Sequence, residues 1–258
     1  MPKPDLTTQC LERARNFSAA VDSLAGRTLL VTGAGSGLGK AVALASAAAG
    51  AQVILSGRSV KRLEASFEEI IKAGGPEPSI APLDLETAVA PQYDELALAV
   101  LKRYGKLDGL VHCAGLLGVL APLSHYDVPT FYRVMHVNVT AAFALTQVLQ
   151  PALEQSVDAS IVFTSSGAGR RGKAYWTGYA ASKFATEGLM QSLADEMSNS
   201  RIRVNAVNPG KARTAMRLQA YPSEDLAMLP EPSSLVGPYL WLLSAASSGV
   251  TGLSCDAQ

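Results

Sequence analysis

Apolar residues occur along the chain in two alternating patterns, short continuous runs and longer stretches with helical spacing. The short runs are rich in Leu, Val and Ile, which is typical of strands buried on both faces of a parallel sheet. They begin near residues 27, 52, 79, 107, 159, 201 and 252. Helix-forming stretches lie between them, after the glycines at 33–39 and over residues 59–73, 90–104, 128–154, 177–199 and 233–244. This alternation predicts an α/β fold, a doubly wound parallel sheet of about seven strands with helices on both faces.

The first 24 residues have a different pattern. Apolar residues at spacings of three and four predict one amphipathic helix over residues 5–24, with charged residues on its other side. The apolar positions are Leu6, Cys10, Ala14, Phe17, Val21 and Leu24, and the charged ones are Glu12, Arg13 and Arg15. The charged side lacks the density of lysine and arginine found in membrane-surface helices. We therefore expect residues 1–24 to form a helical packing arm, followed by one α/β domain over residues 25–258.

Charge and composition narrow the range of partners. Of the 258 residues only 17% are charged, and 22 Lys and Arg balance 22 Asp and Glu. A neutral chain lacks the basic face that nucleic-acid binding needs, and it is not attracted electrostatically to an anionic membrane. The most apolar stretch, residues 41–55, contains polar residues and glycine. It also falls short of the ~20 strongly apolar residues of a membrane span. We expect neither a nucleic-acid partner nor a membrane partner.

The cysteines and the start of the chain indicate the compartment. Cys10, Cys113 and Cys255 lie far apart and outside any CxxC spacing, so neither a disulfide framework nor a zinc cluster is expected. The three histidines, at positions 112, 125 and 136, show no metal-ligand spacing either. The first residues contain no apolar core of a signal peptide. These features favour a protein of the reducing cytoplasm that holds no metal.

The strongest binding motif follows the first predicted strand. Residues 32–39 read TGAGSGLG. The Walker spacing GxxxxGK[ST] fails because positions 34 and 41 are both alanine, and GxGxxG fails from either Gly33 or Gly35. The remaining pattern, TGxxxGxG, uses Gly33, Gly37 and Gly39, which allow a tight turn and leave the start of a helix open to negative charge. A strand, glycine turn, helix and second strand form the βαβ unit that binds a dinucleotide, which favours this function over a merely flexible loop.

The end of the second predicted strand bears on the choice of cofactor. An acidic residue at that place would hold the ribose 2′-hydroxyl of NAD(H), but residues 55–58 read LSGR. Arg58 instead offers a guanidinium group that binds a 2′-phosphate. The sequence therefore favours NADP(H) over NAD(H), against the alternative that Arg58 is an ordinary solvated residue at the start of a helix.

A hydroxyl, a phenol and an ammonium group occur at short separations in residues 161–187. Ser166 precedes Tyr179 by thirteen residues, and Lys183 follows it by four. Four residues are about one helical turn, so Tyr179 and Lys183 are expected on the same helix face. A cation beside a phenol favours the phenolate, and we expect Lys183 to lower the pKa of Tyr179 towards the operating range of an acid catalyst.

Taken in order, these and other motifs resemble the short-chain dehydrogenase/reductase family. They are the TGxxxGxG turn at 32–39, Asp84 with Leu85, Ala114 with Gly115, Asn138, Ser166, YxxxK at 179–183 and Pro209 with Gly210. The resemblance covers residues 27–256 and implies a single Rossmann-type catalytic domain. The stretches LDGLVHCAGLLG, VFTSSGAGRRG, YAASKFATEGLMQ and RTAMR are in addition similar to the YciK-type bacterial oxidoreductases, a branch of that family.

The resemblance implies a role for each matching residue. The catalytic tetrad would be Asn138, Ser166, Tyr179 and Lys183. The pyrophosphate and adenosine would lie along Gly33, Ser36, Gly37, Leu38 and Gly39, with Arg58 at the 2′-phosphate and Asp84 and Leu85 at the adenine. Ala114 and Gly115 would pass beneath the ribose, and Pro209, Gly210 and Thr214 would hold the nicotinamide. Tyr179 and Lys183 would also touch the cofactor.

The implied reaction interconverts a small-molecule carbonyl compound and an alcohol by hydride transfer. Tyr179 would be the general acid or base, and Ser166 would donate a hydrogen bond to the same oxygen. Lys183 would hold the nicotinamide ribose, and Asn138 would hold a water that returns the proton. The alternative is a cofactor-binding sensor with little or no turnover, which would have no chemical need for all four residues.

The chain departs from the family pattern at Cys113, where asparagine usually precedes Ala-Gly. We expect the loss of that amide to weaken a backbone contact near the cofactor without removing chemistry. A redox-sensing thiol is the alternative to a small buried one. Tyr175 and Trp176 are expected either at the substrate mouth or in packing at the helix start. Arg170 and Arg171 are expected in solvent, against the alternative that they meet an anionic substrate.

Two larger features also follow from the resemblance. Residues 211–232 contain three prolines and weak periodicity, and they match a mobile lid that sets substrate specificity. The family further implies a homotetramer or homodimer that packs through the helices holding Asn138 and Lys183.

Overall fold

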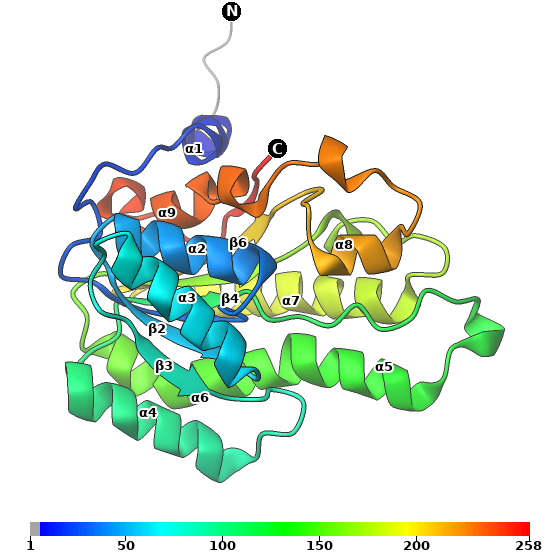
Figure 1. Ribbon diagram of the computed structural model, residues 1–258, viewed down its shortest axis with the longest axis horizontal. Coiled ribbons are helices and arrows are strands. Elements are labelled where there is room, and N and C mark those ends of the chain that lie inside the picture. Colours follow the sequence, from blue (N-terminus) through cyan, green and yellow to red (C-terminus); the bar gives the residue numbers. More distant parts are fainter. Residues whose placement is uncertain (1–5) are drawn as a thin grey trace, which may run out of the picture.

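The sheet is the centre of the molecule, and the computed structural model describes residues 6–258 around it (Figure 1). Its seven strands are β1 Thr28–Thr32, β2 Gln52–Gly57, β3 Ser79–Pro82, β4 Gly109–His112, β5 Ala159–Thr164, β6 Ile202–Asn208 and β7 Ser254–Asp256. They are ordered β3-β2-β1-β4-β5-β6-β7, and every neighbouring pair is parallel. β1 and β4 are buried at every position, as continuous apolar runs predict. The predicted doubly wound α/β fold is confirmed.

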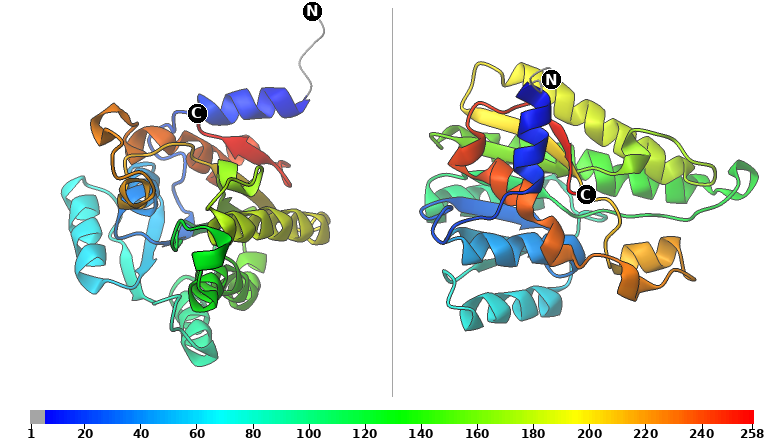
Figure 2. Two further views of the ribbon diagram at one scale, coloured as in Figure 1. Left: turned by 90° about the vertical axis from the view of Figure 1, so that its right-hand side faces the viewer. Right: turned by 90° about the horizontal axis from the view of Figure 1, so that it is seen from above.

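Helices cover both faces of the sheet (Figures 1 and 2). One face carries α2 Gly37–Ala48, α3 Val60–Lys72 and α9 Gly237–Leu243, with α1 Leu6–Arg15 packed on α9. The other face carries α4 Ala90–Tyr104, α5 Val128–Met135, α6 Ala141–Glu154 and α7 Thr177–Glu196. A short helix, α8 Ala215–Ala220, lies beyond the end of β6. No helix within residues 6–258 is both long and apolar enough to cross a membrane.

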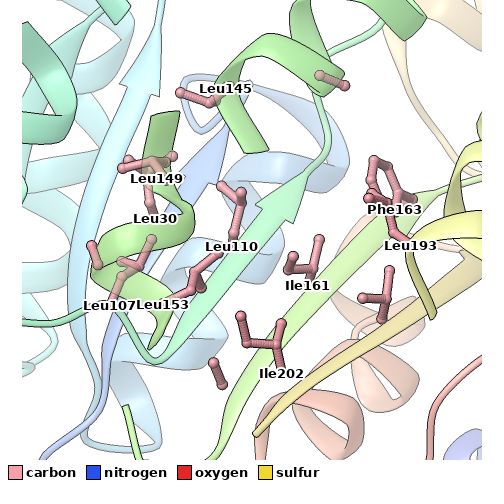
Figure 3. Close-up of a cluster of buried hydrophobic side chains, with 14 of the residues drawn as sticks. Leu30, Leu107, Leu110, Leu145, Leu149, Leu153, Ile161, Phe163, Leu193 and Ile202 are labelled. Atoms are coloured by element: carbon pink, nitrogen blue, oxygen red, sulfur yellow. The ribbon is translucent and has the colours of Figure 1, made fainter. Parts of the chain in front are cut away.

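Alternate residues of each strand supply two hydrophobic cores, because successive side chains of a strand point to opposite faces. Leu29 of β1 belongs to the core under α2, α3 and α9, whereas Leu30 belongs to the core under α4, α6 and α7. In the second core Leu110, Leu149 and Ile161 are fully buried (Figure 3). Since both faces are covered, the ends of the strands are the part of the sheet left for chemistry.

The strand order reverses between β1 and β4. β1 continues into α2 on one face, whereas β4 continues towards α5 on the other. The two connections therefore diverge and leave a crevice at the carboxyl ends of these strands. Ligands of open α/β sheets bind at such a reversal.

The N-terminal helix is shorter than the apolar spacing predicts. α1 ends at Arg15, and residues 21–26 form turns instead of continuing the helix to residue 24. Asp22 has a φ of +65°, and the backbone N–H of Leu24 donates to the carbonyl of Ala49 after α2 at 2.8 Å. The chain must turn here to enter β1, so Leu24 reaches the core through a turn and not along a helix face.

α1 packs against α9 and β7, at the edge of the sheet (Figure 2). Ala14 is fully buried in this contact, and a Cβ at Gly237 would lie only 2.8 Å from the carbonyl oxygen of Phe17. Residues 1–5 of the expected arm lie outside the described part of the chain. The described part of the arm closes one end of a hydrophobic core.

Two further segments differ from the predicted elements. Residues 211–232, for which no helix was predicted, contain α8. With six residues after its N-cap, Thr214, this helix is too short to show a 3.6-residue period. The single helix predicted over 128–154 is interrupted by a π-helical turn, His136–Thr140, which separates α5 from α6.

Candidate active site

A cleft of about 690 Å³ lies at the carboxyl ends of the strands. Its walls come from the glycine turn after β1, the ends of β2 and β3, the loops after β4, β5 and β6, and α8. The predicted site residues that line it are Gly33, Ser36, Gly37, Leu38, Gly39, Arg58, Asp84, Leu85, Ala114, Gly115, Ser166, Tyr179, Lys183, Pro209, Gly210 and Thr214. Asn138 lines an adjoining cavity instead. Within residues 6–258, no three His, Cys, Asp or Glu side chains are grouped to hold a metal ion.

The turn between β1 and α2 depends on its glycines. Gly33 and Gly37 have φ values of +69° and +54°. A Cβ at Gly39 would lie 2.4 Å from the carbonyl oxygen of Gly33, a distance that no side chain tolerates. Ser36 precedes α2 without a side-chain hydrogen bond to its first turn. The first N–H groups of α2 have no partner within the helix, so this end of the cleft offers a site for a phosphate group.

Two arginines lie beyond the glycine turn. Arg58 follows β2, and Arg62 lies one turn further along in α3. Both are exposed and line the cleft, and neither forms an ion pair within the described residues. Guanidinium groups without a carboxylate partner are suited to bind phosphate. The sequence motif predicted Arg58 and missed Arg62, although their i, i+4 spacing is a signal that could have found it.

The structure brings Ser166, Tyr179 and Lys183 together at the other end of the cleft. Tyr179 and Lys183 lie one turn apart on α7, and both are buried. The Lys183 Nζ lies 5.7 Å from the centre of the Tyr179 ring and donates a hydrogen bond to the carbonyl of Thr164 at 2.7 Å. Ser166, on the loop after β5, hydrogen bonds to Tyr179.

Burial dominates the ionisation of these groups. It raises the pKa of the Tyr179 phenol above its usual value, and the hydrogen bond with Ser166 lowers that pKa by less. Burial also lowers the pKa of the Lys183 ammonium group to about 8. The expected fall in the pKa of Tyr179 is therefore not seen, because the loss of hydration on burial outweighs the hydrogen bond with Ser166.

Asn138 lies in the π-helical turn between α5 and α6. Its Nδ2 donates to the carbonyl of Leu116 and to the Ser182 hydroxyl, each at 2.9 Å, and its Oδ1 accepts from the N–H of Leu116 at 2.7 Å. The side-chain amide thus holds the loop after β4 against α7.

Cys113 stands in the loop after β4, where the family pattern has asparagine. The N–H groups of Cys113 and Ala114 both donate to the Thr32 hydroxyl at 3.1 Å, which holds this loop to β1. The thiol accepts a hydrogen bond from Thr164 at 3.3 Å, and burial raises its pKa to about 11. A thiol that stays protonated reacts slowly with oxidants, so this environment favours a packing role over redox sensing.

A second cavity, of about 10 Å³, adjoins the cleft and has room for one water molecule. Asn138, Lys183 and His112 are among its lining residues. His112 is 5% exposed, and its Nε2 lies 2.9 Å from the hydroxyl of Thr146, which itself donates to the carbonyl of Ala142. His112 Nε2 is therefore the donor, and Nδ1 is left as a buried acceptor without a partner among residues 6–258.

The buried His112 makes stability depend on pH. Burial, followed by the charge of Lys183, lowers the pKa of His112 from 6.5 to about 3. The unfolded chain therefore binds a proton as the pH falls below 6.5, whereas the folded chain does not until about pH 3. Between pH 7 and pH 4.5 this difference should remove roughly 2–3 kcal/mol of the free energy of unfolding.

Urea unfolding at pH 7 and pH 4.5 measures this effect. His112→Gln is expected to lose less stability between the two pH values than the wild type, whatever its stability at pH 7. His125→Gln, which changes an exposed histidine, serves as the matched control and should leave the pH dependence unaltered. Equal pH dependence in the wild type and His112→Gln would show that His112 is not held neutral by burial.

Arg170 is exposed to solvent, as expected, and it is also paired. Its Nη1 donates to Asp256 at 2.7 Å and its Nη2 to Ser254 at 2.8 Å, both on β7. Its Nε also lies 3.7 Å from the buried Glu187 of α7. Arg171 is exposed, as expected. These contacts anchor the loop after β5 to α7 and to β7, which lies two strands away in the sheet.

The Pro209 and Gly210 turn is held by a residue that the sequence motifs missed. Gln258 Nε2 donates to the carbonyls of Pro209 and Lys211, each at 2.7 Å. The Asn208 side chain accepts from the N–H of Gly210 at 3.1 Å. Asn208 is recognisable as a local turn former, whereas nothing in the local sequence connects Gln258 to this turn.

The two aromatic residues before α7 differ in position. Trp176 lines the cleft, and its ring meets that of Tyr179 edge-on with centroids 5.8 Å apart. Tyr175 is 58% exposed and is not among the residues that line the cleft. The expectation of a place at the substrate mouth therefore applies to Trp176 alone.

The arrangement is similar to that of known proteins. The family model described as short chain dehydrogenase matches residues 27–225. The uncharacterized oxidoreductase YciK of Escherichia coli K12 is 46% identical over 243 residues, which cover 94% of this chain and 96% of that protein.

Solved structures extend the similarity to three dimensions. A protein of Escherichia coli CFT073, crystallised in complex with NADPH, matches with a TM-score of 0.90 and 47% identity over 92% of this chain and 98% of that one. A protein of Shigella flexneri, crystallised in complex with NADP, matches with a TM-score of 0.91 and 46% identity over 93% of this chain and 100% of that one.

Proposed function

Because this chain belongs to the short-chain dehydrogenase family, we propose that it is an NADP(H)-dependent oxidoreductase that interconverts a carbonyl compound and an alcohol. The observation that carries the proposal is the shared cleft. The same cleft of about 690 Å³ is lined by two groups that lie far apart in the sequence, the glycine turn at 33–39 and the cluster of Ser166, Tyr179 and Lys183. A phosphate site and a proton donor in one cleft suit hydride transfer to a carbonyl group.

Ser166, Tyr179 and Lys183 each have a separate role in carbonyl reduction. NADPH, when bound, supplies the hydride. Tyr179 donates its phenolic proton to the carbonyl oxygen, and Ser166 donates a hydrogen bond to that oxygen as negative charge develops. The Lys183 cation stabilises the phenolate that remains on Tyr179 and has N–H groups to spare for the nicotinamide ribose after its bond to Thr164. In the reverse direction the phenolate accepts the proton of the alcohol.

The remaining cleft residues would position the cofactor. We propose that the N-terminus of α2, with Ser36, Leu38 and the three glycines, holds the pyrophosphate. The adenine would lie between Asp84 and Leu85, the ribose over Ala114 and Gly115, and the nicotinamide against Pro209, Gly210 and Thr214. The cavity of about 10 Å³ that Asn138 and Lys183 line would hold the water that returns a proton.

We propose NADP(H) rather than NAD(H) because Arg58 and Arg62 are both free to bind a 2′-phosphate. The NADP and NADPH complexes of the two similar proteins support this choice. Arg58→Ala is expected to weaken NADPH binding about tenfold, the effect of losing one charge-assisted hydrogen bond, and to leave NADH binding unchanged. Titration of the protein's fluorescence with each cofactor measures both constants.

Arg103→Ala is the matched control for Arg58, because it removes an exposed arginine of α4 far from the cleft. It should alter the binding of neither cofactor. A wild type that binds NADH more tightly than NADPH would overturn the cofactor assignment.

We also propose that the chain forms a homodimer or homotetramer through α6 and α7. Phe143 and Phe184 are 45% and 47% exposed on these helices, which also carry the partly buried Val148 and Leu189. Exposed apolar side chains on adjoining helices are typical of contacts between copies. Phe184→Glu should shift the assembly to monomer in sedimentation velocity, and Leu98→Glu, at an exposed leucine of α4, should not. An unchanged assembly in Phe184→Glu would contradict this interface.

The function itself is tested by turnover. Purified protein is mixed with NADPH and a panel of aldehydes, ketones and quinones, and loss of NADPH absorbance is followed. We expect consumption with at least one class, together with the corresponding alcohol as product. Tight binding of NADPH without turnover of any compound would instead support a cofactor sensor.

A further inference from the structure

The part of the cleft beyond Tyr179 and Ser166 has a mainly apolar wall. Leu116 and Leu117 contribute from the loop after β4, Trp176 from the start of α7, and Met216 and Ala220 from α8. These three elements surround the position that a carbonyl compound must occupy to reach Tyr179. Burial of apolar substrate surface against them is favourable by about 25 cal/mol per Å².

The two polar side chains at this end are already engaged. Gln219 Nε2 donates to the carbonyl of Gly118 at 2.9 Å. Arg217 forms a two-point ion pair with Glu224, through Nε and through Nη2, the latter at 2.6 Å. Among the described residues that line this end of the cleft, Arg217 is the one beyond Lys183 that carries a charge.

The planar guanidinium group of Arg217 is held at its edge by Glu224 and on its flat face by the ring of Tyr221. Its central carbon lies 3.8 Å from the centre of the Tyr221 ring, and its side chain is 18% exposed. On the other side of that tyrosine, Lys173 Nζ donates to the Tyr221 hydroxyl at 2.6 Å and lies 5.4 Å from the Trp176 ring. This stack joins α8 to the start of α7, so Arg217 cannot turn towards a ligand without breaking it.

An anionic substrate would therefore enter at a disadvantage. Its carboxylate or phosphate would lose hydration against an apolar wall, where a neutralised ion pair offers little compensation. An uncharged carbonyl compound loses no such hydration. The hydrogen bond between the two groups raises the pKa of Arg217 and lowers the pKa of Glu224. Both groups therefore stay charged.

We propose that the substrate is an uncharged, apolar carbonyl compound, held between Leu116, Trp176 and Met216, and that the Arg217–Glu224 pair discriminates against anionic substrates. The proposal rests on the proposed reductase function and specifies the substrate class of the same site. It assigns Trp176 and Met216 to substrate binding and Glu224 to specificity.

Matched pairs of compounds test the proposal. Cyclohexanone is compared with 4-oxocyclohexanecarboxylate, and benzaldehyde with 4-formylbenzoate, each with NADPH. In both pairs the wild type is expected to show kcat/KM at least about tenfold higher for the uncharged member. A higher kcat/KM for the carboxylate member, lost in Arg217→Ala, would overturn the proposal.

Glu224→Gln tests the role of the ion pair directly. The amide keeps the size of the side chain but leaves the charge of Arg217 uncompensated, so the ratio of the two kcat/KM values should fall at least threefold. Glu231→Gln is the matched control, because Glu231 pairs in the same segment with Arg213, which does not line the cleft as Arg217 does. An unchanged ratio in Glu224→Gln would show that the pair plays no part in specificity.

Binding separates failure of this proposal from failure of the proposed function. Calorimetric titration of the NADP⁺-loaded protein with each compound compares their affinities even where no turnover occurs. Absence of turnover with tighter binding of the uncharged members would reject the reductase function and keep the site assignment. Turnover together with tighter binding of the carboxylates would keep the reductase function and reject the proposed substrate class.

Discussion

Tyr179→Phe is expected to lower kcat/KM for carbonyl reduction by about 10³-fold, within the range that a positioned general acid contributes. The substitution removes the only hydroxyl of this side chain and keeps the ring that packs against Trp176. NADPH binding should change little, because the glycine turn and the arginines are untouched. Steady-state rates with the best carbonyl compound, together with an NADPH titration, measure both quantities.

Tyr175→Phe is the matched control for this prediction. It makes the same chemical change at a neighbouring tyrosine that lies outside the cleft, and it should retain wild-type activity. Equal rates of NADPH consumption in the wild type and Tyr179→Phe would exclude Tyr179 as the proton donor. The fold and the cofactor site would not be affected by that result.

Gly39→Ala should abolish cofactor binding. The added Cβ would meet the carbonyl oxygen of Gly33 at 2.4 Å and that of Thr32 at 2.9 Å, so α2 and the turn must separate. Since both contacts are to backbone, no side chain can move to relieve them. We expect at least about a 100-fold loss of NADPH affinity, or about 3 kcal/mol, accompanied by a lower melting temperature.

Gly172→Ala makes the same change where a Cβ would have no neighbour within 4 Å and should leave both properties as in the wild type. Fluorescence titration and thermal unfolding followed by circular dichroism provide the comparison. Wild-type affinity in Gly39→Ala would mean that the turn opens without loss and that its shape does not define the phosphate site.

The substrate end of the cleft shows what a family resemblance leaves undecided. The matching motifs predict a proton donor and a cofactor site, and such motifs are shared by enzymes with different substrates. Specificity in this chain depends on Trp176, Met216 and the pairing of Arg217 with Glu224. None of these belongs to a motif, and the pairing is visible only once α8 and the turn that follows it are in place.

Local pattern by itself determined the strands, most helices and the glycine turn. A continuous apolar run such as that of β1 is buried on both sides only in a sheet that is covered on both faces. Gly33, Gly37 and Gly39 are required by the backbone geometry of a turn only eight residues long. The spacing of Tyr179 and Lys183 likewise sets both on one helix face. Such features depend on neighbours in the chain, so the sequence is sufficient to predict them.

Tertiary structure decided the features that depend on strand order and burial. The bonds from Gln258 to Pro209 and Lys211, and those from Asn138 to Leu116, join residues that only the folded sheet brings together. Burial also reversed the expected shift of the Tyr179 pKa. The phenol loses its hydration because many residues from distant segments surround it, and a sequence motif does not show that surrounding. The sequence by itself therefore determined which groups could react, and the packing of distant segments decided their ionisation, their partners and the wall that the substrate meets.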